Sequence, residues 1–138
     1  MNTELIIHDG PQDTCFGCGQ ANHSGLRMTF RRTGDRAEAD YTVPDIYNGT
    51  PGVVHGGIQA ALLDEVMGIC AHGIYPDDRV VTASFNLRYR RPVPTNTPLL
   101  IRGRITREEP PSLFIEGEIT DPDGEVLTTA EARWRRLS

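Results

Sequence analysis

The chain has 138 residues, of which 38% are hydrophobic and 24% are charged, and its net charge at pH 7 is −5. This length and composition suit one globular domain with its own core, so we expect residues 1–138 to fold as a single domain. The acidic balance argues against nucleic acid as a partner, because phosphate binding needs a basic surface. No apolar run approaches the length that spans a membrane, so we expect no membrane partner either.

The first ten residues, MNTELIIHDG, lack the basic segment and the apolar stretch of a signal peptide, and we expect none. The three cysteines are an odd number and suggest no disulfide framework. Both observations favour a reducing, cytoplasmic location.

Residues 1–25 are punctuated by glycines, which predicts an irregular lead-in. This segment contains a CxxC motif, Cys15-Phe16-Gly17-Cys18. A zinc knuckle needs two more ligands, and only His23 is near in the sequence. A redox CxxC should open a helix, which the following residues do not predict. We therefore favour a turn that packs two small sulfur side chains and expect no metal, with metal and redox roles as the alternatives.

Two strands are predicted before the longest apolar segment. Leu26–Thr33 alternates between apolar and polar residues, as expected for a half-buried strand. After a turn at Gly34-Asp35, residues 37–43 alternate in the same way and complete a hairpin. Residues 44–54 form a predicted loop.

The only long segment that predicts a helix runs from about residue 57 to residue 72. Within residues 58–71 only Gln59, Asp64 and Glu65 are polar, so the helix is expected to be buried on most sides. Asp64 lies on a face of glycines and alanines, opposite the bulky apolar residues. A carboxylate there is partly desolvated, which raises its pKa and makes it a candidate base or nucleophile. Glu65 lies about 100° away on the helical wheel and is expected to be a solvated or interface charge.

The helix starts at His55-Gly56-Gly57, where backbone N–H groups lack partners within the helix. Two adjacent glycines leave these groups unshielded, which suits a developing oxyanion assisted by the helix dipole. The alternative is a glycine pair that only makes a tight turn. Gly57 and Asp64 share a face but lie about 10 Å apart along the axis. Because one chain cannot easily bring both to the same carbonyl, we predict a symmetric dimer with two composite sites.

Four strands are predicted after the helix: Val80–Tyr89, Leu99–Arg107, residues 113–119 and Val126–Arg135. In the first of them, strict alternation groups Thr82 with Ser84 and Asn86 on the outward face. Two strands, one buried helix and four more strands predict a two-layer α+β fold in which the sheet curves around the helix.

Three segments resemble the hotdog-fold acyl-CoA thioesterases of the PaaI-like (phenylacetate-pathway) group. GVVHGGIQAALLDE carries the HGG motif with Asp64 nine residues after His55, and TASFNLRYRRPVP is similar to the third strand of the family. CFGCGQANHSGLRMTF is similar to the lead-in of many bacterial members. The resemblance implies a curved antiparallel sheet around a central helix, and hydrolysis of acyl-CoA thioesters without a metal or bound cofactor. It also implies a homodimer that joins its third strands and often pairs again into a tetramer.

The resemblance assigns a role to each catalytic candidate. Asp64 matches the catalytic acid, acting as general base on a water or as direct nucleophile. The Gly57 N–H, together with Gly56, matches the oxyanion donor. Thr82 matches a threonine that helps hold the water in one branch of the family. His55 matches the motif histidine, which shapes the loop or touches the thioester carbonyl, with a purely structural role as the alternative.

Five further residues are candidates for substrate binding. Asn48 resembles an Asn or Gln that precedes HGG in relatives, although its offset differs among branches. Gln59 hints at a polar element near the pocket. Arg88, Arg90 and Arg91 match the region near the coenzyme A phosphates, for which arginine is well suited. Alternation puts Arg91 on the opposite face from the other two, and a solvated strand face is the alternative.

Two other functions remain open at this point. A hotdog hydratase or dehydratase acting on acyl thioesters needs a differently placed acid and histidine. A non-catalytic acyl-CoA-binding module would keep the fold without the chemistry.

Overall fold

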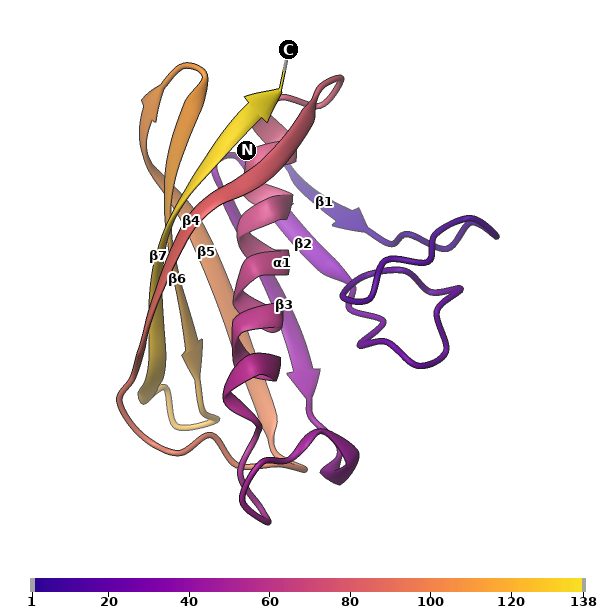
Figure 1. Ribbon diagram of the computed structural model, residues 1–138, viewed down its shortest axis with the longest axis vertical. Helices are drawn as coiled ribbons and strands as arrows, with labels where there is room; N and C mark the ends of the chain where they lie inside the picture. Colours follow the sequence, from indigo (N-terminus) through magenta and orange to yellow (C-terminus); the bar gives the residue numbers. More distant parts are fainter. Residues whose placement is uncertain (1, 138) are drawn as a thin grey trace.

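The computed structural model describes residues 2–137, with one long helix, one short 3-10 helix and seven strands (Figure 1). In chain order these are β1 (Thr3–Ile6), β2 (Phe30–Thr33), β3 (Arg36–Thr42), η1 (Asp45–Tyr47), α1 (Gly56–Ile74), β4 (Arg79–Tyr89), β5 (Pro98–Glu109), β6 (Ser112–Thr120) and β7 (Val126–Leu137).

The strands form a single antiparallel sheet in the order β1-β2-β3-β5-β6-β7-β4. Figure 1 shows this sheet curving around α1, which confirms the expected α+β fold. Strand alternation builds the two faces of the sheet. Ile101 and Ile115 are buried against the helix side, whereas Arg102 and Glu116 are exposed on the outer face.

Helix α1 supplies the centre of the core. Leu62, Leu63, Val66, Met67 and Cys70 are fully buried, as the bulky half of the predicted wheel requires. The helix is slightly longer at each end than the predicted 57–72. Among the described residues, the structure has no helix with both the length and the apolar character needed for a bilayer span.

The lead-in is only partly irregular, so the prediction for residues 1–25 is wrong at its start. Residues 3–6 form β1, which pairs with β2 from Thr3 opposite Thr33 to Ile6 opposite Phe30. Leu5 is largely exposed. An exposed strand at the sheet edge has no buried alternating face, and for this reason the sequence pattern does not reveal it.

Strand β4 contains a β-bulge that corrects the predicted facing of its residues. Its pairing with β7 shifts register between Thr82 and Ser84, with Ala83 as the extra residue. A bulge reverses which residues of a strand face the core. Val80 is buried and Thr82 reaches the helix before the bulge, while Phe85 packs inward after it. The expected outward position of Thr82 is therefore wrong.

Strand β4 is also the long free edge of the sheet. It has 11 residues, compared with 4 in β1 at the other edge. Most residues of β4 are exposed. The exposed fraction is 39% for Val81 and 55% for Tyr89. A long edge strand presents unpaired N–H and C=O groups that are available to another strand.

Candidate active site

The carboxylate of Asp64 is half-buried on α1 and accepts a hydrogen bond from Thr82 of β4. The Thr82 Oγ1 to Asp64 Oδ1 distance is 2.7 Å. Burial raises the pKa of Asp64 above its ordinary value, and the Thr82 hydroxyl opposes this in part by stabilising the charged form. A carboxylate with a raised pKa is a stronger base than an exposed aspartate, as expected from its place among small residues.

An indole ring packs against α1 one helical turn after Asp64. The absence of a side chain at Gly68 makes room for the ring of Trp134, since a Cβ there would lie 2.8 Å from Cη2. Trp134 is also the β7 partner of Thr82. Its indole Nε1 is buried and has no hydrogen-bond partner among residues 2–137. The indole therefore lies opposite Thr82 in the sheet and against α1 at Gly68.

The helix start has a more specific geometry than the sequence suggests. His55 is the N-cap of α1, and its Nδ1 accepts a hydrogen bond of 2.9 Å from the Gly57 N–H. The alternative structural role of His55 is thus present, and the expected oxyanion donor already has a partner within the chain. The Gly56 N–H donates to no protein acceptor within the described residues. Gly57 becomes available to a ligand only when the imidazole turns away.

Tyr89 is a site residue that the sequence reasoning missed. At the end of β4 its hydroxyl donates to the Gly56 carbonyl at 3.0 Å, and its ring covers Gly56. The available signal was an aromatic residue within the Arg-Tyr-Arg-Arg-Pro segment. Tyr89 ties the free edge strand to the glycine turn.

Gln59 lies in the core, which corrects its assignment to the substrate pocket. Its side chain is only 4% exposed. The amide donates to the Val54 carbonyl at 3.1 Å and accepts from the Thr128 hydroxyl at 2.6 Å. Because buried polar groups need such partners, Gln59 joins the loop, the helix and β7. Asn48 is half-buried in the loop before α1, where its backbone forms an isolated antiparallel β-bridge with Val54.

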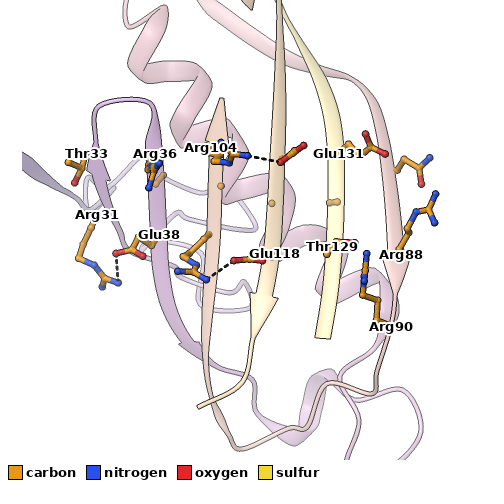
Figure 2. Close-up of a pocket in the computed structure, with 17 residues that line it drawn as sticks. Arg31, Thr33, Arg36, Glu38, Arg88, Arg90, Arg104, Glu118, Thr129 and Glu131 are labelled. Carbon is orange, nitrogen blue, oxygen red and sulfur yellow. Dashed lines mark hydrogen bonds and ion pairs between the residues drawn. The ribbon is translucent and has the colours of Figure 1, made fainter. Parts of the chain in front are cut away.

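The arginine candidates lie away from Asp64. Arg88 and Arg90 line an open hollow of about 930 Å³ on the outer face of the sheet, together with Glu131 (Figure 2). Arg91 instead pairs with Glu125 at 2.8 Å. The predicted split of these arginines between two faces is confirmed. Asp64, Thr82 and His55 do not line this hollow. The hollow is therefore separate from the place where the candidate catalytic acid lies.

The candidate residues form two groups within one chain. Asp64 and Thr82 make one group, and the helix start with His55, Gly57 and Tyr89 makes the other. Gly57 and Asp64 both lie within the helix α1, so their separation of about 10 Å along its axis holds.

A curved antiparallel sheet around one helix that begins at His-Gly-Gly defines a hotdog-fold protein. The chain belongs to the thioesterase superfamily, whose family model matches residues 51–128. The resemblance inferred from the sequence motifs is thereby confirmed.

The chain is similar to relatives that carry thioesterase names. Acyl-coenzyme A thioesterase THEM4 of Rattus norvegicus is 32% identical over 81 residues, which are 59% of this chain and 34% of that protein. The chain therefore spans about a third of the length of this curated relative.

Two crystal structures share the fold. A thioesterase superfamily protein superposes with a TM-score of 0.76 at 29% identity, covering 85% of this chain and 57% of that one. A phenylacetic acid degradation-related thioesterase from Ralstonia eutropha JMP134 gives a TM-score of 0.73 at 27% identity, covering 81% and 86%.

Proposed function

We propose that this chain hydrolyses an acyl-CoA thioester to a free acid and coenzyme A, with Asp64 as general base or nucleophile. The observation that carries the proposal is the half-buried Asp64 carboxylate, with a raised pKa and a hydroxyl partner at 2.7 Å. Membership of the thioesterase superfamily and the similarity to THEM4 support the substrate class.

The carboxylate geometry suits activation of water. Thr82 occupies Oδ1 and fixes the orientation of the group, which leaves Oδ2 for a water molecule. The water oxygen bonds to the thioester carbonyl carbon as its proton moves to Asp64. The tetrahedral oxyanion then collapses, the carbon–sulfur bond breaks, and the coenzyme A thiolate leaves and takes up the proton. In the nucleophilic alternative the carboxylate attacks the carbonyl carbon first, the carbon–sulfur bond breaks and the coenzyme A thiolate leaves. Water then hydrolyses the resulting anhydride, which releases the acid and restores the Asp64 carboxylate.

The oxyanion needs donors that Asp64's own helix start cannot supply at about 10 Å. We propose that a second copy pairs with the free edge of β4 and brings its Gly56 and Gly57 amides opposite Asp64. The Gly56 N–H serves directly, and the Gly57 N–H serves once the His55 ring turns away. Tyr89 holds the glycine turn in position through its bond to the Gly56 carbonyl. Two such dimers pairing again would give the proposed tetramer.

The coenzyme A phosphates are assigned to Arg88 and Arg90. Both line the outer hollow next to the dimer edge, and no carboxylate lies within 4.0 Å of either among the described residues. Free guanidinium groups suit phosphate through charge-assisted hydrogen bonds. Arg91 is excluded from this role because Glu125 already pairs with it.

A thiol-release assay over short, long and aromatic acyl-CoAs tests the reaction class. At least one substrate is expected to release free coenzyme A with turnover, and crotonyl-CoA hydration is expected to be absent. Hydration without thiol release would instead assign the chain to the hydratases. Stabilisation by acyl-CoA with no release from any substrate would assign it to the binding modules.

Thr82→Val is expected to lower kcat/KM about tenfold, because the lost hydrogen bond to a charged group both orients the carboxylate and stabilises it. Since that bond lowers the pKa of Asp64, its loss raises the pKa further and moves the acid limb of the pH–rate profile to higher pH. Thr82→Ser keeps the hydroxyl and is the matched control. A Thr82→Val profile that superposes on the wild-type profile would contradict this positioning role.

A further inference from the structure

Three metal-ligating side chains come together where the lead-in meets α1. The ligand atoms of Cys15, Cys18 and Glu65 all lie within 4.8 Å of one another. Cys15 Sγ is 3.0 Å from Glu65 Oε1. Glu65, expected to be a solvated or interface charge, is a half-buried carboxylate that faces two sulfur atoms of its own chain.

Backbone hydrogen bonds hold the CxxC turn in this place. The Gly19 N–H donates to the Cys15 carbonyl at 2.9 Å, and the Met28 N–H donates to the Gly17 carbonyl at 2.9 Å. Gly17 rests directly on the carboxylate, since a Cβ at this position would lie 1.9 Å from Glu65 Oε1. Only glycine allows the turn to approach the helix this closely, so both sulfur atoms reach Glu65.

A histidine that the sequence reasoning did not consider lies beside this cluster. His8 Nδ1 is 3.2 Å from Cys18 Sγ. The Gln20 N–H bonds to the His8 carbonyl, and His8 bridges to Gly19, which keeps the two segments side by side. His8 does not belong to the set of ligand atoms that lie within 4.8 Å of one another, so its side chain has to move to complete a four-ligand set. His23, the nearby histidine in the sequence, is exposed.

We propose that Cys15, Cys18, Glu65 and His8 bind a zinc ion. Zinc takes sulfur, nitrogen and carboxylate oxygen ligands in a tetrahedron, with bonds of about 2.0–2.3 Å that place neighbouring ligand atoms about 3.3–3.8 Å apart. The observed Cys15–Glu65 and His8–Cys18 distances of 3.0 Å and 3.2 Å are slightly shorter than this range. The 4.8 Å limit on the three-ligand cluster lies above it. Two thiolates favour zinc over magnesium or calcium, which prefer oxygen ligands. The proposal departs from the expected metal-free lead-in.

Four protein ligands make this a structural site. A catalytic zinc keeps an open position for water, whereas a closed set of ligands mainly stabilises the fold. Glu65 lies about 100° around α1 from Asp64, so the ion would sit off the Asp64–Thr82 pair and take no part in the hydrolysis. The role of the ion would be to hold the lead-in, residues 1–25, against α1 at Glu65, which directly follows Asp64 in the sequence.

The test measures metal rather than activity, so its outcome is independent of the proposed hydrolysis. Full-length protein purified under reducing conditions without chelator is expected to contain about one zinc per chain by mass spectrometry. Reconstitution of the metal-free protein with Co²⁺ is expected to produce thiolate-to-cobalt charge-transfer absorption and the intense visible bands of a tetrahedral site. Failure to bind either ion would overturn the proposal.

Ligand variants locate the site. Cys15→Ser and Glu65→Gln are expected to weaken zinc binding more than the roughly 10–100-fold that loss of an outer-shell partner costs. His8→Ala is expected to weaken it likewise, and Cys70→Ala and His23→Ala serve as matched controls that keep wild-type affinity. Wild-type zinc affinity in Cys15→Ser would overturn the assignment.

Stability gives a second readout. Chelation of the ion is expected to lower the Tm of the wild-type protein by about 5 °C or more, because a ligand that binds only the folded state stabilises it. The same treatment is expected to leave the Tm of Cys15→Ser unchanged. Equal chelator effects on both proteins would contradict a structural ion held by Cys15.

Discussion

Replacing Asp64 with asparagine is expected to lower kcat for thioester hydrolysis by about 10³-fold or more while the fold is retained. A positioned general base typically contributes about 10²–10⁴-fold, and an amide can neither take a proton from water nor attack the carbonyl. Asparagine has the shape of aspartate, and its Oδ1 still accepts the Thr82 hydrogen bond. Steady-state thiol release at saturating acyl-CoA measures the loss, with circular dichroism and sedimentation as checks on fold and assembly.

The same substitution is expected to raise the Tm at pH 7. Burial raises the pKa of Asp64 in the folded protein, so the folded state favours the protonated carboxyl. Its stabilising contribution is complete below the unfolded pKa, close to the ordinary value of 3.8, and is lost as the pH rises through the folded pKa. Asparagine never ionises and avoids this loss. The gain in Tm should therefore be present at pH 7 and disappear below about pH 3.8.

Asp77→Asn is the matched control for Asp64→Asn. Asp77 is exposed in the loop after α1 and forms no ion pair among residues 2–137, so both turnover and Tm should stay near wild type. Near-normal turnover in Asp64→Asn would refute the assigned base. Unchanged Tm at pH 7 would show that the carboxylate is better solvated than its half-buried position implies.

The helix and most strands could be predicted because their signals are local. Asp64 stands out on a face of small residues, and the alternation of residues 99–105 appears in β5 without change of face, up to the register irregularity between Ile105 and Arg107. The HGG turn likewise marks the helix start in a few neighbouring residues. Such patterns depend on period and burial alone, which the sequence contains.

The features that the sequence did not predict depend on pairing between distant segments. The facing of Thr82 follows from the bulge in the β4–β7 register, which no periodicity within β4 reveals. One exception is local: the Gly57 N–H is taken by the side chain of the N-cap His55 two residues away, a contact that the motif did not predict. Glu65 meets the CxxC turn from 50 positions away, so counting ligands near Cys15 could not find it.

Adding positive charge to the free edge is expected to separate the dimer and remove activity together. The double variant Ser84→Lys, Asn86→Lys changes two exposed residues on the outer face of β4, whose side chains form no hydrogen bond within the described residues. In a dimer paired through β4, the new lysines add positive charge to an edge that already carries Arg88, and like charges on the two paired edges repel. Analytical ultracentrifugation should show a monomer. Thiol release should fall by about 10²–10³-fold, the usual cost of a lost oxyanion donor.

Glu131→Lys provides a control of equal charge change. It also changes the net charge of the outer face by +2, by replacing one negative charge with one positive charge, but on β7, one strand inside the edge. Glu131 forms no ion pair among residues 2–137. This variant should stay dimeric and active. A monomeric double-lysine variant with wild-type turnover would show that one chain suffices, and the composite site would be wrong.

Mixed dimers separate shared sites from mere dependence on assembly. Gly57→Pro removes one amide donor and is tolerated in the first turn of a helix. Refolding it together with Asp64→Asn gives heterodimers in which one Asp64 faces one intact Gly57. If each site draws its acid and its donor from different chains, these heterodimers regain one working site although both parents are inactive. If each site lies within one chain, every site carries a defect and mixing restores nothing.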